Sequence, residues 1–576
     1  MEKLLSQYRL LLTSYNSVLA YSLLGIIGGL ASGMIVLAFE VTITQLGGLL
    51  AQPSDAGDFE SLPTWLLIAL PAGGATVLGG IYALLKPEDR ETGIVHVISC
   101  MHANYGALPL RNAIVQFFGG AFALATGQSG GREGPGVHLG GAINSLLGQW
   151  LHLPNNSLRV LVACGTAGGI SAAFQTPLAG VIFAMEVIVA EYTVVGFIPV
   201  ILAAVAASAV SQYFSPDSVL FALPELHLHS LLELPLIILL GFCCGMTVSA
   251  YIRMSSYAAS FSHRPVWLRF AIAGTITGLL AAWVPQVLGL GYDTLAMTLQ
   301  GQIAVSMLLG IAVAKLIATA VCCGVGMPVG LIAPNLIIGA CIGGVMGTVL
   351  HAMLPNIAAD PTLYILLGMG AAMGAVLNAP LAAILAIMEM THTISISMAA
   401  MLAIVTATLT NTGLFGQRSA HQSVLHQLLR SIPDDPVNQL LHRSAVTATM
   451  DPRAVRVPVS LDEEDFTVLL GSTPTWCVIE RDGKDLYMVR GEELLTWLKE
   501  SPFTDGMVEL TAADICRWTV TEVPIEATLK QATDAMHLHT CEAACVYQHS
   551  QRTGKKLIQG VVTRERIENF SLAGLQ

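Results

Sequence analysis

The chain has 576 residues, of which 54% are hydrophobic and only 11% are charged. Soluble domains carry about 25% charged residues, so this composition argues against an ordinary soluble protein and for one with many membrane segments. The net charge is −12 without a basic stripe of interleaved aromatic residues, so we expect no nucleic-acid partner. Charged residues become frequent only late in the chain, which predicts a membrane domain at 1–430, a linker at 431–443 and a soluble domain at 444–576.

Apolar windows follow one another through the first domain, and several are shorter than the ~20 residues that span a bilayer. Many are broken by Gly or Pro, which is typical of discontinuous helices that meet at a site in the middle of the membrane. Lys3 and Arg9 precede the first window, and the loops 86–92 and 263–270 carry further positive charge. Because positive loops stay inside the cell, we expect a multi-pass protein of the cell (inner or plasma) membrane, with its N-terminus and soluble tail in the cytoplasm.

The membrane domain contains an internal repeat. Residues 174–187 (FQTPLAGVIFAMEV) resemble residues 377–390 (LNAPLAAILAIMEM) at a constant offset of 203. The identical pairs are Pro177/Pro380, Leu178/Leu381, Ala179/Ala382, Met185/Met388 and Glu186/Glu389. Chance similarity between two apolar helices would not place Pro and Glu at one offset, so we predict two related halves with a binding site at their interface.

A glycine-rich segment with two charges, SGGREGP at 129–135, interrupts the apolar windows. Its glycines allow backbone N–H groups to approach a ligand, and its proline suits the first turn of a helix. Helix N-termini attract anions through unpaired N–H groups and the helix dipole. A carboxylate at Glu133 would compete with the anion for these donors, which favours a gate over the alternative of an Arg132–Glu133 ion pair.

Two further segments have the composition of an anion-binding helix start. They are ETGIV at 91–95 and GVGMPVGLIAPNLIIGA at 324–340. Each segment alone could equally be a close helix crossing that requires glycine. Together with SGGREGP, they favour several loops that converge on one desolvated anion.

GREGP at 131–135, GLIAP at 330–334 and the paired TPLAG…ME and APLAA…MEMT segments resemble the CLC chloride channel and transporter family. The resemblance covers about residues 15–428. It implies an all-α polytopic membrane domain of two inverted repeats with discontinuous helices, and a homodimer with one anion pathway in each subunit. It also implies that Glu133 is the gate and that the pathway is lined by Thr92, Gly93, Ile94, Gly131, Arg132, Gly134, Leu331, Ile332 and His421.

Proton-coupled members of this family usually carry a second glutamate at the position of Val187. Valine cannot relay a proton, so we predict passive, channel-like and voltage- or pH-gated conduction, most naturally of chloride. The first alternative is a proton-coupled antiporter of chloride or another anion such as bicarbonate, which uses Glu133 alone. The second is a CBS-regulated cation transporter or membrane sensor.

The sequence has no Walker-type loop and suggests no enzyme activity.

The tail contains two similar segments, at 444–500 and 512–570, each with the pattern of strands and helices found in a tandem CBS pair. CBS copies that bind adenine nucleotides carry a Thr followed by an Asp three residues later. Here the corresponding residues are Thr563 with Arg566, and Arg490 with Glu493. We therefore predict no cofactor and a structural or dimerising role. His537, His539, Cys541 and Cys545 could suggest a zinc site, but their spacing matches no common zinc site, so we predict no bound metal.

Overall fold

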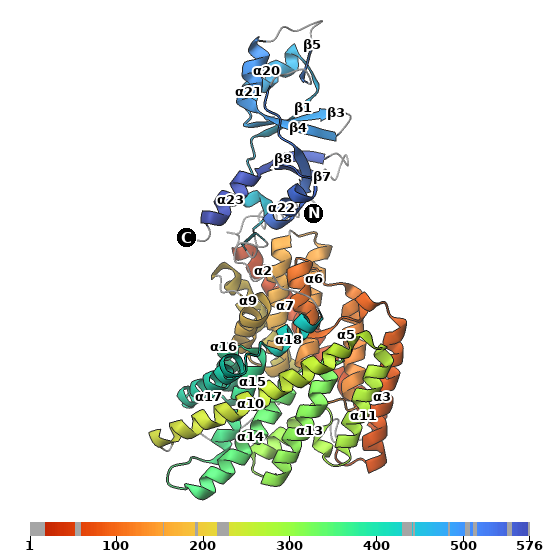
Figure 1. Ribbon diagram of the computed structural model, residues 1–576, viewed down its shortest axis with the longest axis vertical. Coiled ribbons are helices and arrows are strands. Elements are labelled where there is room, and N and C mark those ends of the chain that lie inside the picture. The colour runs from red at the N-terminus through yellow and green to blue at the C-terminus, as the bar shows by residue number, and fades with distance from the viewer. Residues whose placement is uncertain are drawn as a thin grey trace. The chain divides into compact units, whose positions relative to one another are not determined.

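The computed structural model describes residues 18–51, 59–153, 155–190, 194–215, 228, 230–428, 440–441, 444–481, 484–500, 507–510, 515–549 and 556–573. Two compact units form, one from Val18–Leu151 with Leu158–Ile432, and one in which Pro433–Gln576 is the largest part. Figure 1 shows a bundle of helices for the first and a mixed α/β arrangement for the second. Lys3, Arg9 and nearly all of the predicted linker lie outside the described residues.

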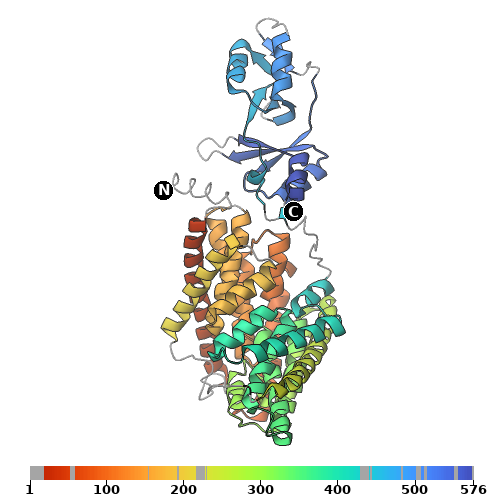
Figure 2. The same cartoon turned by 90° about the vertical axis from the view of Figure 1, so that its left-hand side faces the viewer.

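The first half of the helical unit consists of helices that differ widely in length. They are α2 (Val18–Ala51), α3 (Thr64–Leu84), η1 (Pro87–Arg90), α4 (Gly93–Ala103), α5 (Leu110–Ala125), α6 (Glu133–Trp150), α7 (Asn155–Phe174), α8 (Pro177–Phe183), η2 (Ala184–Val189) and α9 (Val194–Phe214). Helix α2 runs along the edge of the unit, where its red ribbon is visible in Figure 2. Segment η2 continues α8 as a π-helical turn.

The second half repeats this series of long and short helices. It contains η3 (Leu231–Glu233), α10 (Leu234–Ala259), η4 (Ser260–His263), α11 (Val266–Ala281), η5 (Pro285–Val287), α12 (Tyr292–Leu299), α13 (Val305–Gly324), α14 (Ile332–Met353), α15 (Pro361–Leu377), α16 (Pro380–Thr391), α17 (Ser397–Leu409), η6 (Thr410–Leu414) and α18 (Ala420–Gln427). Across the part of the chain that is described, eight helices have the length and hydropathy needed to cross a bilayer. Short helices such as α4, α8 and α16 complete the unit.

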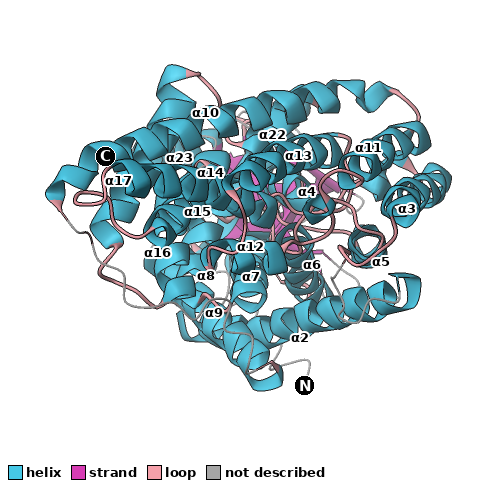
Figure 3. Cartoon of the chain, turned by 90° about the horizontal axis from the view of Figure 1, so that it is seen from below, coloured by secondary structure: helices cyan, strands magenta, loops and turns pink. Residues whose placement is uncertain are grey.

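The helices pack in equivalent pairs within each half. Helix α2 packs on α9 and α10 on α17, while α3 of the first half packs on α11 of the second. Figure 3 shows α4, α6 and α12 inside a surround of longer helices that includes α2, α3, α10 and α17. The first residues of α6 and α14, Glu133 and Ile332, are buried in the interior of the unit, so these two helices begin there.

Glycines allow the closest crossings. Gly140 of α6 lies against the backbone of Gly165 in α7, and Gly339 of α14 lies against Gly368 in α15 in the same reciprocal manner. A side chain at any of these positions would overlap a carbonyl group of the facing helix, so small residues are required, as is common between membrane helices. The same crossing thus occurs once in each half.

Reciprocal contacts relate the two halves by an approximate twofold axis. The N–H of Gly131 donates to the carbonyl of Gly330, and the N–H of Gly330 donates to the carbonyl of Gly131, both at 2.7 Å. Further out, Glu389 accepts the N–H of Ala179 at 2.8 Å, while Glu186 accepts the N–H of Ala382 at 2.9 Å. Such exchanged contacts are the signature of a twofold relation, and they confirm the prediction of two repeats.

The second unit contains two copies of one β-α-β-β-α motif. The first copy comprises β1 (Ala454–Pro458), β2 (Ser460–Asp462), α20 (Glu463–Ser472), β3 (Trp476–Arg481), β4 (Lys484–Arg490), α21 (Gly491–Glu500) and β5 (Met507–Glu509). The second comprises β6 (Val520–Pro524), α22 (Leu529–Leu538), β7 (Ala543–His549), β8 (Lys556–Thr563) and α23 (Arg564–Ala573). In each main sheet a parallel strand pair is followed by an antiparallel one, with orders β1-β3-β4 and β6-β7-β8. This α/β architecture agrees with the predicted fold class.

Candidate functional site

Glu133 is the first residue of α6, and its side chain is fully buried. Its Oε1 atom accepts the N–H of Ala333 at 3.1 Å and the hydroxyl of Tyr292 at 3.3 Å. Ala333 lies in the first turn of α14, where backbone N–H groups have no partner within their own helix. The carboxylate of Glu133 therefore occupies the anion-attracting end of a helix from the opposite repeat.

The backbone segments that are hydrogen-bonded at Gly131 and Gly330 lie close against this carboxylate. A β-carbon on Gly330 would lie only 2.6 Å from Oε2 of Glu133, and one on Gly131 would overlap the same oxygen. Glycine is therefore required on both sides for the side chain to fit. The N–H of Gly131 is already donated to the carbonyl of Gly330 and is therefore not free for an anion. That Gly131 lines the anion pathway stays a prediction.

The side chain of Arg132 contacts α2 and does not pair with Glu133, its neighbour in the sequence. Its guanidinium pairs with Glu40, donates to the carbonyl of Ala173 at 2.9 Å, and lies 5.3 Å from the ring centre of Tyr292. The structure thus replaces the Arg132–Glu133 ion pair considered from the sequence with an Arg132–Glu40 pair. These contacts hold the start of α6 and the ring of Tyr292 in place. The assignment of Arg132 to the lining of the anion pathway stays a prediction.

A cavity of about 410 Å³ is lined by Gly134, the residue after Glu133 in α6. Most of the predicted anion-binding positions line it: Thr92, Gly93, Ile94, Gly134, Leu331 and His421. These residues come from the starts of α4, α6 and α14 and from α18, so the predicted helix starts meet at one hollow. Gly131, Arg132 and Ile332 are not part of its lining.

Two arginines give this cavity a positive wall. Arg90 caps the end of α3 by donating to the carbonyl of Leu85 at 2.9 Å, and Arg269 donates to that of Val325 at 3.1 Å. Both line the cavity, with Glu91 as an acidic neighbour. Charge of this sign concentrates anions at the mouth of a low-dielectric passage.

The donors inside the cavity differ in availability. The N–H of Gly93 donates to Oε1 of Gln116 at 2.7 Å, and Gln116 in turn donates to the carbonyl of Pro328 at 3.0 Å. The N–H of Gly93 is therefore engaged with Gln116, although Gly93 lines the cavity as the sequence predicted. His421, by contrast, is buried, and its Nδ1 has no hydrogen-bond partner among the described residues. A buried polar atom left unpaired beside a cavity is a candidate ligand contact.

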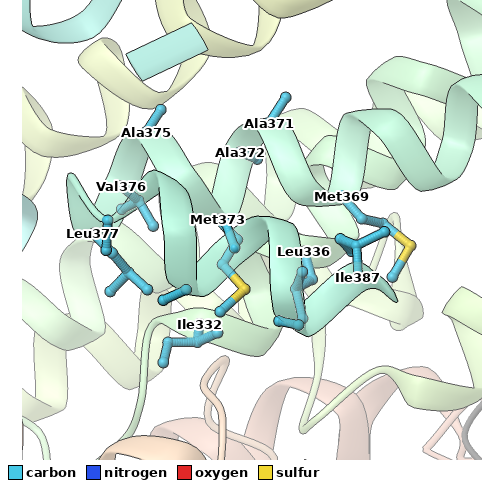
Figure 4. Close-up of a cluster of buried hydrophobic side chains, with 14 of the residues drawn as sticks. Ile332, Leu336, Met369, Ala371, Ala372, Met373, Ala375, Val376, Leu377 and Ile387 are labelled. Carbon is cyan, nitrogen blue, oxygen red and sulfur yellow. The ribbon is translucent and has the colours of Figure 1, made fainter. Parts of the chain in front are cut away.

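Ile332 and Val187 lie in apolar surroundings. Ile332 is the counterpart of Glu133 in the second repeat, and its side chain joins Leu336 and Met373 in the hydrophobic cluster of Figure 4. Val187 is half-buried in η2, next to Glu186. The two repeats therefore share a backbone frame but place one carboxylate at only one of the two equivalent helix starts.

The tail positions singled out from the sequence also have defined surroundings. The guanidinium of Arg566 pairs with Asp451 at 3.2 Å, and its backbone N–H donates to the hydroxyl of Thr563 at 3.4 Å. No group of three or more potential metal ligands is found within the described residues. The four His and Cys residues of 537–545 are among those residues.

Two membrane repeats are related by a twofold axis, and a buried carboxylate lies between a helix start of each. This arrangement is that of a membrane protein that transports anions. The sequence profile described as "Voltage gated chloride channel" matches residues 73–412, and the chain belongs to this CLC family of anion channels and transporters, which are not enzymes. A chloride channel protein described as ClcB-like from Ralstonia nicotianae is 32% identical over 66% of this chain and 91% of its own length.

Other relatives have names that specify exchange. H(+)/Cl(−) exchange transporters ClcA from Vibrio campbellii and Vibrio cholerae are 29% and 30% identical, over 73% and 71% of this chain and 91% and 89% of their own lengths. A slow cyanobacterial Cl−/H+ antiporter has a related structure, with a TM-score of 0.63, 23% identity, and coverage of 71% of this chain and 98% of its own. A eukaryotic CLC transporter has a TM-score of 0.59, 18% identity, and coverage of 95% and 97%. These structures establish the fold.

Sequence reasoning missed three contributors to the site. Tyr292 contacts Glu133, and Glu40 pairs with Arg132. Gln116 accepts the N–H of Gly93 at the start of α4. All three lie far in the sequence from the residues that they contact. None belongs to a motif. Tyr292 follows a Gly-rich turn. Glu40 and Gln116 are polar residues in apolar helices, and this unusual position is a signal that could have identified them from the sequence.

Proposed function

We propose that this protein exchanges a small anion, most naturally chloride, for protons, and that Glu133 closes the pathway when it is ionised. The observation that carries the proposal is the contact between the Glu133 carboxylate and the N–H of Ala333 at 3.1 Å. A carboxylate in this position takes the donor that an anion would use. Protonation of Glu133 removes its negative charge, so the side chain releases the donor and the anion enters.

The names of the relatives favour coupling over the passive conduction that Val187 suggested. Several curated proteins at 29–30% identity are called H(+)/Cl(−) exchange transporters. The valine removes one relay position, but protons can still reach Glu133 by another route. Coupled exchange is therefore the better supported function, and uncoupled conduction is the result that would replace it.

The anion pathway in this proposal starts in the cavity of about 410 Å³. Arg90 and Arg269 attract the anion, and His421 donates to it from the unpaired nitrogen. Leu331 and Gly134, at the starts of α14 and α6, offer backbone N–H groups closer to the gate. Lys86 and Arg90 lie before α4, and Arg264 and Arg269 lie at the start of α11. Because Lys and Arg near the ends of membrane helices favour the cytoplasmic side, we place this cavity on that side.

Flux measurements on proteoliposomes test the proposal. The wild-type protein is expected to move protons against a chloride gradient, so that its reversal potential shifts with pH at a fixed chloride gradient. Glu133→Gln and Glu133→Ala are expected to keep chloride flux and to lose at least nine-tenths of the proton flux, because neither side chain can carry a proton on and off. Glu88→Gln, in an exposed turn, is the matched control.

Two results would overturn this function. A wild-type reversal potential that follows chloride alone would establish uncoupled conduction. Coupled flux that survives in Glu133→Gln would remove the gate assignment. Parallel runs with nitrate, bicarbonate and fluoride identify the preferred anion.

The proposal includes a homodimer formed through α8, α9, α16 and α17. Glu186 and Glu389 are half-buried, and the leucines beside their helix caps, Leu178 and Leu381, are 55% and 50% exposed. Carboxylates near a lipid-facing surface would be costly in hydrocarbon. A second subunit that covers this face removes the cost.

We propose that the second unit is a tandem CBS pair in the cytoplasm with a structural or dimerising role. The two copies share strand order, and both carry a register shift at the same point, between Ile479 and Glu480 and between Val546 and Tyr547. Arg566 takes the position of the nucleotide-binding Asp and pairs with Asp451. This pairing supports the expectation of a unit without an adenine nucleotide.

A further inference from the structure

Two histidines form a buried pair beside the gate helix. Nδ1 of His96 in α4 lies 2.8 Å from Nε2 of His138 in α6, and the two rings are stacked with centres 5.1 Å apart. His96 is 5% exposed and His138 is not exposed at all. One nitrogen of this contact must carry a proton that the other accepts, so the pair is a hydrogen-bonded link between two helices of the first repeat.

One end of the pair opens onto the cavity. His96 is among the cavity-lining residues, and its Nε2 lies 3.3 Å from Sγ of Cys100 and 4.0 Å from a carboxylate oxygen of Glu91. Glu91 also lines the cavity. A proton from water in this hollow can therefore reach His96 directly or through the Glu91 carboxylate.

The other end lies inside the protein. Nδ1 of His138 is buried and has no hydrogen-bond partner among the described residues. A histidine kept only for packing would normally have both nitrogens satisfied, because an unpaired buried polar atom costs free energy. His138 is five residues beyond Glu133 in the same helix, which is about 7.5 Å along the axis.

We propose that His96 and His138 relay protons between the cavity and the interior of the pathway in which Glu133 stands. The inference rests on the proposed exchange function. A proton binds Nε2 of His96, the proton on Nδ1 of His96 passes to Nε2 of His138, and Nδ1 of His138 releases its proton to water in the pathway. One proton enters and one leaves, and each imidazole returns to a neutral form with its two nitrogens exchanged.

The helix that carries His96 lies next to the position of the missing relay. Helix α4 packs directly against η2, the turn that contains Val187. In coupled relatives, a glutamate at the position of Val187 would supply the titratable group in this region. Here α4 and its partner helix α6 supply imidazoles instead, which titrate near neutral pH in their unperturbed state.

Paired measurements of chloride and proton flux in proteoliposomes test this relay. His96→Gln and His138→Gln keep polar side chains of similar size but cannot accept and release protons at neutral pH. Each is expected to lower the proton flux at least tenfold, while chloride flux stays within threefold of the wild type. His102→Gln is the matched control, because His102 lies in the same helix and its Nδ1 atom bonds the carbonyl of Ile98 in its own helix, at 2.8 Å, outside the His96–His138 pair.

The outcomes separate the relay from the exchange function. If the wild type moves no protons, the exchange function and the relay both fail. If the wild type is coupled and both variants keep the wild-type ratio of protons to chloride, the relay alone is wrong. Gel filtration and chloride flux check that each variant is folded, and if one of the two fails this check, the other decides.

Discussion

At the scale of single residues, the site depends on how one carboxylate is held. Glu133 and Ile332 occupy equivalent helix starts in the two repeats, yet only Glu133 can take a proton. Its Oε1 atom has one backbone donor and one side-chain donor, Tyr292. In the proposed function, the closed position of Glu133 is therefore stable but not permanent, because a protonated carboxyl loses much of the energy of both contacts.

Tyr292→Phe tests the contribution of the hydroxyl. The substitution keeps the ring that packs against Arg132 but removes a donor 3.3 Å from Glu133. A hydrogen bond of this kind is worth about 0.5–1.5 kcal/mol, so we expect chloride flux at neutral pH to rise about two- to tenfold as the closed position weakens. The measurement is initial chloride efflux from proteoliposomes. Tyr257→Phe, on an exposed part of α10, serves as the control, and an unchanged rate for Tyr292→Phe would show that the hydroxyl does not hold the gate.

At the scale of helices, the twofold relation explains why short helices can meet inside a membrane. Each repeat supplies one glycine crossing, at Gly140 with Gly165 and at Gly339 with Gly368. Each also supplies a carboxylate that accepts the N–H groups at a helix start of the other repeat. These contacts satisfy backbone groups that lipid cannot, so broken helices are stable only because their ends meet protein.

Gly368→Ala tests the close crossing of α14 and α15. The added methyl group would overlap the carbonyl of Gly339, so the helices must separate. Overpacking of this kind typically costs about 1–3 kcal/mol, and we expect thermal denaturation in detergent to begin several degrees lower. Gly80→Ala in α3, where the position has open space, is expected to melt with the wild type or slightly above it. Equal melting of the two variants would contradict a tight crossing.

At the scale of the whole molecule, each repeat presents one helix start with an exposed leucine, and the two helices, α8 and α16, pack against each other. Leu178 and Leu381 occupy equivalent positions, and Glu389 and Glu186 cap the helices to which they belong. Within a membrane, helices associate by close packing because lipid tails are as apolar as leucine. A complementary second subunit would pack against these side chains more densely than lipid does.

The double variant Leu178→Ala/Leu381→Ala tests this face. Truncation removes packing from both subunits, so we expect the dimer to dissociate at a concentration at least tenfold higher than for the wild type. Light scattering on diluted, detergent-solubilised protein gives the mass. Leu84→Ala, which removes an exposed leucine at the end of α3, should leave the dimer unchanged. An equal loss in both variants would place the interface elsewhere.

Much of the fold could be predicted because the informative residues are close together in the sequence. The offset of 203 between two Pro-Leu-Ala helix starts predicted two repeats, and GREGP predicted a charged helix start in the membrane. These features follow from local backbone chemistry, in which glycine and proline set where a helix begins. The gathering of Thr92, Leu331 and His421 around one cavity agrees with the predicted convergence of helix starts.

The sequence by itself determined the family, the two repeats, the position of a glutamate at a helix start inside the membrane domain and the paired motifs of the tail. Only the tertiary structure decided which donors are free. In the folded protein, the N–H groups of Gly131 and Gly93 donate to protein acceptors. Arg132 pairs with Glu40, and His96 is hydrogen-bonded to His138. The physical reason is that a motif fixes backbone shape over a few residues. A hydrogen bond between distant segments depends on how every helix between them packs.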